Sequence, residues 1–171
     1  QSNDPEYLIR SWHVTPTDKY DFNDGEGKIE VKSTTSDERT HIFSIGQLNP
    51  DGEGGLLIAS VIVSQIGVGK SIFDLTDSIS QRIGDSGVII KLREIVLSTI
   101  GPHIEEVNKI FFDYNKGVHE YLLFDYKQVP SISVDNIPIE VTRVSFQSDL
   151  TNCIPVDKGS YNVNYKLYRS L

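Results

Sequence analysis

Two carboxylates and one ammonium group lie close together near the N-terminus of the chain. Asp21 is followed, after eight intervening residues, by Glu30, and Lys32 comes two positions later. Carboxylate oxygens are ligands that Mg²⁺ prefers, and a bound cation can activate water and stabilise charge on a phosphoryl group. A lysine beside such a cation can orient the attacking water or stabilise the transition state. These residue types are what a magnesium-dependent phosphodiesterase would need.

The sequence around these residues predicts a β-hairpin that brings their side chains together. Residues 28–33 alternate polar and apolar side chains, which is typical of a half-buried strand. Glu30 and Lys32 would share one face of that strand, because successive side chains point to opposite faces. Residues 24–27, Asp-Gly-Glu-Gly, predict the turn, since glycine adopts positive φ without steric cost.

The predicted turn fixes the register of the hairpin. Three cross-strand pairs follow from it: Asn23 with Lys28, Phe22 with Ile29, and Asp21 with Glu30. Directly opposed side chains lie about 5 Å apart at Cβ, where two carboxylates repel each other unless a cation lies between them. We therefore expect Asp21 and Glu30 to be metal ligands, with the Val31 carbonyl oxygen as a further ligand. The alternative is a surface hairpin in which Glu30 and Lys32 form a solvated pair of little energetic value.

The hairpin and the residues around it resemble a known nuclease superfamily. Asp21, Glu30 and Lys32 in this context are similar to the motif of the PD-(D/E)XK superfamily, which has the restriction-endonuclease-like fold. The similarity is concentrated in residues 12–48, in these segments: Trp12, Tyr20-Asp21-Phe22, Glu30-Val31-Lys32-Ser33-Thr34, Arg39-Thr40-His41-Ile42 and Gln47-Leu48. They resemble a bacterial PD-(D/E)XK family whose members tend to be encoded beside restriction-modification genes.

Two departures from the pattern of the superfamily are visible. Tyr20 stands where the superfamily has proline, and only 20 residues precede Asp21, so the usual N-terminal helix is short or missing.

This resemblance implies a fold and an activity. The fold would be α/β (α+β), with a restriction-endonuclease-like mixed central sheet flanked by helices and a C-terminal β extension. The protein would be an endonuclease that uses Mg²⁺ or Mn²⁺ to hydrolyse phosphodiester bonds of double-stranded DNA, in restriction-modification or phage defence. Because a duplex has two strands to cut, a homodimer is expected, with restriction-modification proteins as further partners.

The resemblance also implies roles for individual residues. Asp21 and Glu30 would hold the metal. Lys32 would assist the attack by water, and Gln47 would orient either Lys32 or the phosphate.

Two other functions remain open at this point. The first is a catalytically inactive module that keeps the nuclease fold and binds DNA or a protein. The second is a hydrolase acting on nucleotides or RNA. The net charge of −8 argues against a nucleic-acid role, because proteins that bind DNA phosphates usually carry a basic face.

The most basic and aromatic segment is the C-terminus, with Lys158, Tyr161, Tyr165, Lys166, Tyr168 and Arg169. We interpret its tyrosines as core or partner contacts rather than as a stacking platform for bases.

Other local motifs do not indicate a different chemistry. Residues 67–71, Gly-Val-Gly-Lys-Ser, are similar to a phosphate-binding loop but lack the glycine required at Ser64, so we interpret them as a turn before a helix. The four histidines show no zinc-like pairing, and we interpret His41 as a surface strand residue. Cys153 is the sole cysteine, no run of eighteen apolar residues occurs and no signal peptide is visible. These observations predict a cytoplasmic protein without a membrane span.

Length and composition predict one globular domain. A chain of 171 residues can bury a sizeable core. Residues 1–3 resemble the remnant of an expression tag and the chain has no methionine, so we expect residues 4–171 to form a single domain that lacks an N-terminal segment. Beyond the hairpin, strands are expected at 39–45, 56–66, 121–126, 141–146 and 161–168, and helices at 71–83, 88–100 and 104–112.

Overall fold

The computed structural model describes residues 2–13, 15, 17–157 and 165–171. Its helices are α1 (Pro5–Ser11), α2 (Ile45–Leu48), α3 (Ile72–Ser80), α4 (Ser86–Ile100), α5 (Ile104–Val107), α6 (Tyr114–His119) and α7 (Lys166–Arg169). Its strands are β1 (Phe22–Asn23), β2 (Gly27–Thr34), β3 (Thr40–Ser44), β4 (Gly55–Ile62), β5 (Gln65–Ile66), β6 (Phe111–Phe112), β7 (Tyr121–Asp125) and β8 (Ser145–Asp149). Short 3₁₀ turns lie at Gly101–His103, Tyr126–Gln128 and Val134–Asn136.

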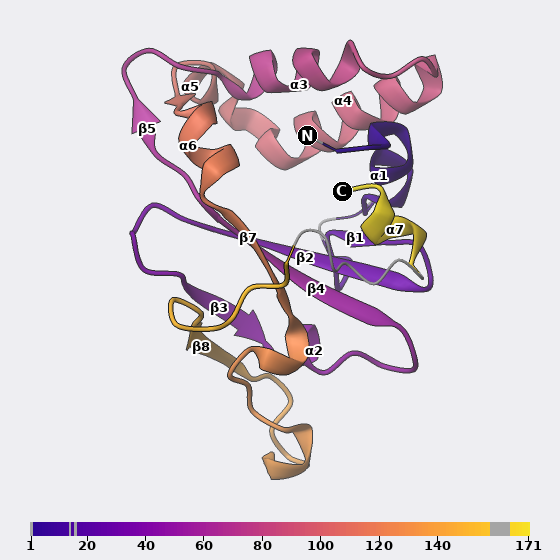
Figure 1. The fold of residues 1–171 in the computed structure, drawn as a ribbon, viewed down its shortest axis with the longest axis vertical. Coiled ribbons are helices and arrows are strands. Elements are labelled where there is room, and N and C mark those ends of the chain that lie inside the picture. Colours follow the sequence, from indigo (N-terminus) through magenta and orange to yellow (C-terminus); the bar gives the residue numbers. More distant parts are fainter. Residues whose placement is uncertain (1, 14, 16, 158–164) are drawn as a thin grey trace.

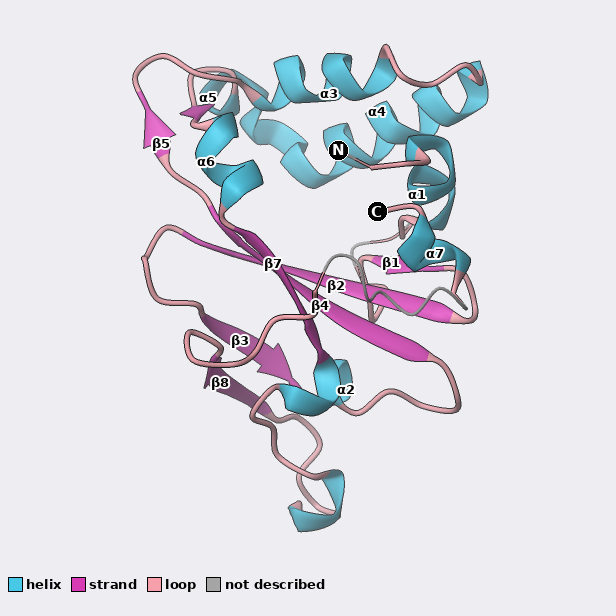
Figure 2. Ribbon diagram, in the orientation of Figure 1, coloured by secondary structure: helices cyan, strands magenta, loops and turns pink. Residues whose placement is uncertain are grey.

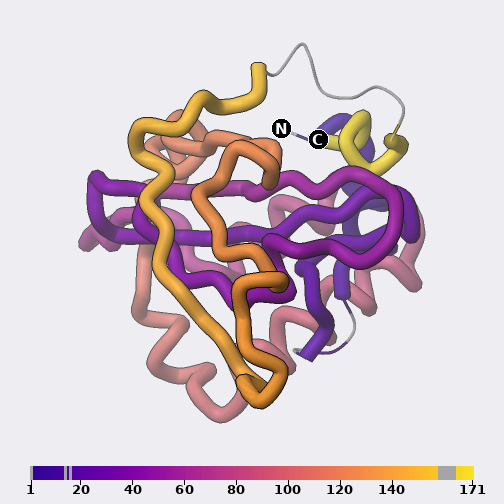
Figure 3. Tube along the Cα trace, turned by 90° about the horizontal axis from the view of Figure 1, so that it is seen from below, coloured from indigo at the N-terminus to yellow at the C-terminus, as the bar shows by residue number. Residues whose placement is uncertain are grey.

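A four-stranded mixed sheet in the order β1-β2-β4-β7 forms the centre of the fold. β2 runs antiparallel to β1 and parallel to β4, and β7 runs antiparallel to β4. Helices α3 and α4 lie over one face of this sheet, and the β3–β8 pair with α2 lies on the other side (Figures 1 and 2). Seen from below, the segment that leads from β7 through β8 crosses in front of the central strands (Figure 3). The predicted fold class, a mixed central sheet flanked by helices, is confirmed.

Each face of the central sheet has its own apolar cluster. On the helical side the cluster contains Ile29, Leu57, Ala59, Leu123, Leu167 and Tyr168. On the β3 side it contains Tyr20, Phe43, Leu48, Leu56, Ile58, Phe124, Val129 and Leu150. Burying one large apolar side chain contributes roughly 1.5–3 kcal/mol. The two clusters therefore hold β2 and β4 firmly between layers, and the polar residues of β2 are fixed with them.

The hairpin has the register that the turn chemistry predicts. Phe22 pairs with Ile29 and Asn23 pairs with Lys28. Asp24 stabilises the turn, because its Oδ1 accepts hydrogen bonds from the backbone N–H groups of Glu26 (3.0 Å) and Gly27 (2.7 Å). The strand expected at 39–45 and the helices expected at 71–83 and 88–100 are also present, as β3, α3 and α4.

The strand expected at 56–66 and the helix expected at 104–112 are wrong in their second halves. β4 ends at Ile62, and Gln65–Ile66 leaves the sheet to form β5. Its partner is Phe111–Phe112, which forms β6 instead of the end of a helix. The helical spacing of 104–112 continues only as far as Val107, because the pairing with β5 gives the two phenylalanines an extended partner.

Helix α6 was not expected from the sequence. The Asp113 carboxylate caps it by accepting the N–H of Lys116 (2.9 Å). Two further expectations need correction in the C-terminal half. The strand expected at 141–146 begins at Ser145. Of the strand expected at 161–168, residues 158–164 lie outside the described part, and Lys166–Arg169 is helical. The adjacent residues Leu167 and Tyr168 are both buried. A helix permits this, whereas in a strand with one solvent-exposed face two adjacent side chains would point to opposite faces.

Helix α1, which precedes the hairpin, is short. α1 has seven residues, and Asp4 caps it by accepting the N–H of Tyr7. Its acidic residue Glu6 accepts the N–H groups of Gly84 (2.7 Å) and Asp85 (3.2 Å), so it serves the loop between α3 and α4. In the described part of the chain, no helix has both the length and the apolar character needed to cross a membrane.

Candidate active site

β2 presents Glu30 and Lys32 on the face that β3 and α2 cover. The Glu30 side chain is 6% exposed and the Lys32 side chain 19% exposed, and Lys32 Nζ lies 2.8 Å from Glu30 Oε1. Lys32 Nζ also lies 5.2 Å from the centroid of the Phe43 ring, a favourable place for a cation. The two residues are therefore a buried pair and not the solvated surface pair that was the alternative.

Gln47 joins the two charged groups. Its Nε2 donates a short hydrogen bond to Glu30 Oε1, and its Oε1 accepts from Lys32 Nζ (3.3 Å). The same Oε1 accepts the backbone N–H of Ser44 (3.0 Å), which forms a capping box at the start of α2. The start of a helix therefore places an amide between a carboxylate and an ammonium group.

Asp21 lies at the open edge of the hairpin. Its Oδ2 accepts the backbone N–H of Val31 (2.7 Å). The Val31 carbonyl points to the same edge, because a strand residue directs its N–H and C=O to the same neighbour. The Asp21 backbone N–H also faces the Glu30 carboxylate. The structure thus brings together Asp21, Glu30, Val31, Lys32 and Gln47, the full set that the sequence indicated.

Burial and charge act in opposite directions on Glu30. Burial raises the pKa of the Glu30 carboxyl, and the hydrogen bond and positive charge of Lys32 partly offset this. The negative charge of Asp21 raises the pKa further. The site therefore favours a neutral Glu30 more than water does, and an additional positive charge nearby would favour its ionised form.

A buried polar network supports the site from β3 and β4. His41 Nε2 lies 2.8 Å from Ser60 Oγ, and Arg39 Nη1 donates to both the carbonyl oxygen and the Oγ of Ser60 (3.0 Å each). Ser60 is the β4 residue paired with Lys32. Burial, followed by the positive charges of Lys32 and Arg39, lowers the pKa of His41. His41 is thus a strand residue, as predicted, but the expected surface position is wrong. It is 4% exposed and joins β3 to the strand beside Lys32.

His13 is a neighbour of the site that the sequence did not reveal. Its backbone N–H donates to the Asp21 carbonyl oxygen (2.8 Å), and its Nδ1 lies 3.6 Å from Asp21 Oδ1. The contact arises because Trp12 forms a bridge with Phe22 at the free edge of β1. No spacing rule links these positions, so no local sequence signal could have indicated the contact.

A family model agrees with this arrangement. The model described as "Putative PD-(D/E)XK family member, (DUF4420)" matches residues 1–151. The chain belongs to this family. Neither curated proteins nor solved structures gave a match. Membership of DUF4420 confirms the resemblance carried by residues 12–48 and indicates a nuclease-like function, for which PD-(D/E)XK proteins generally use divalent metals.

The oxygen atoms of this DUF4420 site fit a hard divalent cation. Asp21 and Glu30 supply carboxylates and Val31 supplies a carbonyl at the same edge. Among the described residues, no group of three or more His, Cys, Asp or Glu side chains could hold a metal. Zinc sites usually need three or four such side chains, whereas Mg²⁺ is typically held by one or two carboxylates with water and substrate phosphates. The donor set therefore suits a hard divalent cation.

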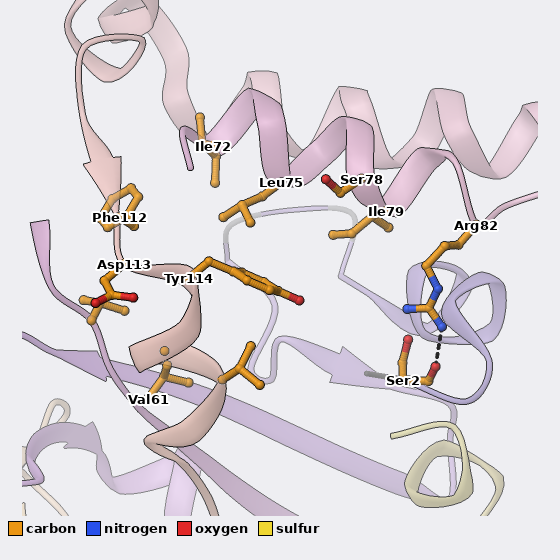
Figure 4. Close-up of a pocket in the computed structure, with 13 residues that line it drawn as sticks. Ser2, Val61, Ile72, Leu75, Ser78, Ile79, Arg82, Phe112, Asp113 and Tyr114 are labelled. Atoms are coloured by element: carbon orange, nitrogen blue, oxygen red, sulfur yellow. Dashed lines mark hydrogen bonds between the residues drawn. The ribbon is translucent and has the colours of Figure 1, made fainter. Parts of the chain in front are cut away.

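An apolar cavity with a volume of about 550 Å³ lies away from the candidate active site. Its walls come from α3, α6 and β4 and include Val61, Leu75, Ile79 and Tyr114 (Figure 4). At its rim, Arg82 donates to the backbone oxygen of Ser2 (2.6 Å). Val61 lies on the same face of β4 as Leu57 and Ala59, because side chains two positions apart in a strand share a face. The cavity therefore lies on the face of the sheet opposite Glu30.

Proposed function

We propose that this DUF4420 protein is a Mg²⁺-dependent endonuclease that hydrolyses phosphodiester bonds of double-stranded DNA. The observation that carries the proposal is the contact between Glu30, Lys32 and Gln47 beside the Asp21 carboxylate. In this proposal Asp21, Glu30 and the Val31 carbonyl hold the cation. When bound, the cation supplies an activated water and stabilises charge on the phosphate.

The residues of the chain divide the remaining work. The Lys32 ammonium has three donors, of which one is directed to Glu30 and one to Gln47. The third is free to donate to the attacking water or to a phosphate oxygen. Gln47 acts through its neighbours, because it fixes both Glu30 and Lys32. The Asp21 side chain is 28% exposed against 6% for Glu30, so the substrate approaches from the Asp21 side.

We also propose a symmetric homodimer, because the two strands of a duplex call for two sites and a two-fold axis provides them. Restriction-modification or phage-defence proteins are the partners that the family resemblance suggests. Linearisation of a supercoiled plasmid in a single binding event would support paired sites, whereas nicking alone would argue for a monomer.

Metal binding and cleavage together test the proposed function. Mg²⁺ and Mn²⁺ are titrated calorimetrically into the wild type and into Asp21→Ala/Glu30→Ala. The control is Asp135→Ala/Glu140→Ala, which removes two exposed carboxylates. We expect binding in the wild type and the control only, and plasmid cleavage that follows the same pattern. Absence of both metal binding and cleavage in the wild type would contradict the proposal.

One observation favours a second candidate, a nuclease-fold module that binds without cleaving. Glu30 Oε1 already accepts from Lys32 and Gln47, so one oxygen of this carboxylate is engaged by the chain itself. Such a module would bind duplex DNA with the same affinity with or without Mg²⁺, and Lys32→Ala would not change its behaviour. Single-stranded RNA and free nucleotides, tested beside duplex DNA, distinguish the remaining hydrolase alternatives.

A further inference from the structure

A pocket of about 370 Å³ lies against the open edge of the hairpin. Its lining includes Arg10, Trp12, His13, Lys19, Tyr20 and Lys91. Small-molecule sites in proteins usually measure about 300–1,000 Å³, so the pocket has room for one nucleotide unit. We propose that it binds the nucleotide next to the scissile phosphodiester, with Lys91 contacting a phosphate of the same strand. The substrate identity rests on the proposed function.

The pocket and the candidate active site share a wall. His13 lines the pocket, and its Nδ1 lies 3.6 Å from Asp21 Oδ1. Tyr20, another lining residue, directly precedes Asp21 in the chain. A ligand in the pocket would therefore lie beside the carboxylate that is proposed to hold the cation. This is where the neighbouring nucleotide of a bound strand would be placed.

Lys91 is the cation of the pocket that remains open to an anion. Its Nζ donates to the carbonyl oxygens of Arg10 (2.7 Å) and Trp12 (3.0 Å), which leaves one of its three donors. Within the described part of the chain, no carboxylate forms an ion pair with Lys91. Burial and the positive charge of Arg10 lower the pKa of Lys91, so its surroundings disfavour the charged form. An approaching phosphate would relieve this cost.

The other two cations of the pocket have acidic partners. Arg10 is paired with Asp85, and Lys19 Nζ lies 2.9 Å from Asp51 Oδ2. They shape the wall and add positive charge, which these acidic partners partly offset. Asp18 is the carboxylate of the lining. The local set of cations provides a phosphate contact in a chain whose overall net charge is −8.

An aromatic wall suits a nucleobase. The Trp12 ring stacks on Phe22 with a centroid distance of 5.4 Å and an angle of 26°. Its orientation is therefore fixed, while the residue is only half-buried and lines the pocket. Bases stack on aromatic side chains with little dependence on sequence. The combination of one open ammonium and one fixed indole matches the phosphate and the base of a nucleotide.

The sole tryptophan of the chain provides a direct measurement, because Trp12 itself lines the pocket. Deoxythymidine 3′,5′-bisphosphate is titrated into the metal-free protein, and the tryptophan fluorescence is recorded. We expect a saturable change in the wild type. Lys91→Met should weaken binding about tenfold or more, because hydrogen bonds to charged groups are among the stronger ones. The matched control Lys109→Met, which removes an exposed lysine outside the pocket, should bind like the wild type.

A second variant guards against a folding defect in Lys91→Met. Asn23 lines the pocket, and its Oδ1 accepts the N–H of Gly25 (2.9 Å). Asn23→Asp keeps that hydrogen bond and adds a negative charge, so it should also weaken binding of the bisphosphate. Urea unfolding of each variant shows whether its fold is intact.

The outcomes separate the pocket from the proposed function. Equal affinity in the wild type and both pocket variants would overturn the proposal, as would equally tight binding of inorganic phosphate, which would indicate a simple anion site. Unchanged fluorescence while the bisphosphate binds would place the ligand elsewhere and overturn it as well. Lys91-dependent binding in a protein that never cleaves DNA would uphold the pocket and count against the nuclease alone. DNA cleavage by a wild type whose pocket variants bind the bisphosphate normally would support the nuclease and overturn the pocket.

Discussion

Gln47 serves three partners at once, so its replacement should be costly for stability. Gln47→Leu keeps a similar volume and removes the hydrogen bonds to Glu30, Lys32 and the Ser44 N–H. A hydrogen bond to a charged group contributes about 1.5–3 kcal/mol, and loss of a helix cap costs about 0.5–2 kcal/mol. We expect the free energy of unfolding to fall by about 2–4 kcal/mol. For a chain of this size the midpoint of thermal unfolding should fall by roughly 5–15 °C.

Urea unfolding followed by circular dichroism measures this change. The denaturant dependence should stay the same while the midpoint falls, because the compactness of the two states is unaltered. Gln128→Leu, at an exposed glutamine, is the matched control and should leave the midpoint unchanged. A double-mutant cycle with Glu30→Met isolates the bond to the carboxylate, and its coupling energy should be about 1.5 kcal/mol or more.

Two results would refute this reasoning. A loss below about 0.5 kcal/mol would place Gln47→Leu among ordinary surface substitutions. Coupling near zero in the cycle would mean that Gln47 acts through the start of α2 and not through Glu30. In that case the contact that carries the proposed function would have no energetic significance.

Three further predictions follow from the same geometry. Lys32→Met should abolish DNA cleavage and leave duplex affinity within about threefold, as measured by gel assays of both; loss of affinity in step with cleavage would contradict the assigned role. Glu30→Gln should remove a pH dependence of the free energy of unfolding. The pKa of Glu30 in the folded protein is raised from its usual value of 4.5. As the pH rises from 4.5 through the pKa in the folded protein, the wild type therefore loses free energy of unfolding, and the variant, which has no carboxyl at this position, does not. Urea unfolding from pH 4 to 8 should show this divergence, and parallel curves would contradict it. Arg39→Met removes the bonds to two buried acceptors of Ser60 and to the part-buried carbonyl oxygen of Glu120. It should lower the free energy of unfolding by about 3 kcal/mol; a change within 0.5 kcal/mol by calorimetry would show that water replaces the guanidinium.

The hairpin could be predicted because its determinants are local. Two glycines and Asp24 set the turn, and strand alternation then sets the faces of Glu30 and Lys32. Gln47 was indicated by resemblance alone, since its contact depends on how α2 folds back over β2. The site residues within a single hairpin were therefore accessible from the sequence, while those joined by tertiary packing were not.

The remaining differences arise from pairings between distant segments. β5 and β6 are each two residues long and exist only because they pair across the α3–α5 helices. His13 reaches Asp21 only because Trp12 extends the edge of β1. The pocket beside Asp21 needs Lys91 from α4, seventy positions further along the chain. Periodicity and turn rules describe neighbours in sequence, so none of these contacts could be derived from them.

The turn between β1 and β2 also limits which insertions and deletions the hairpin can accommodate. β2 is locked to β4 through eight consecutive residue pairs, so a change of length at Asp24–Gly27 would move β1 and Asp21 instead. A shift of one residue would turn the Asp21 side chain to the opposite face and away from the Val31 N–H, unless a bulge absorbed it. A shift of two would restore its direction. Among members of the family, the number of residues between the aspartate and the glutamate should therefore vary mainly in steps of two.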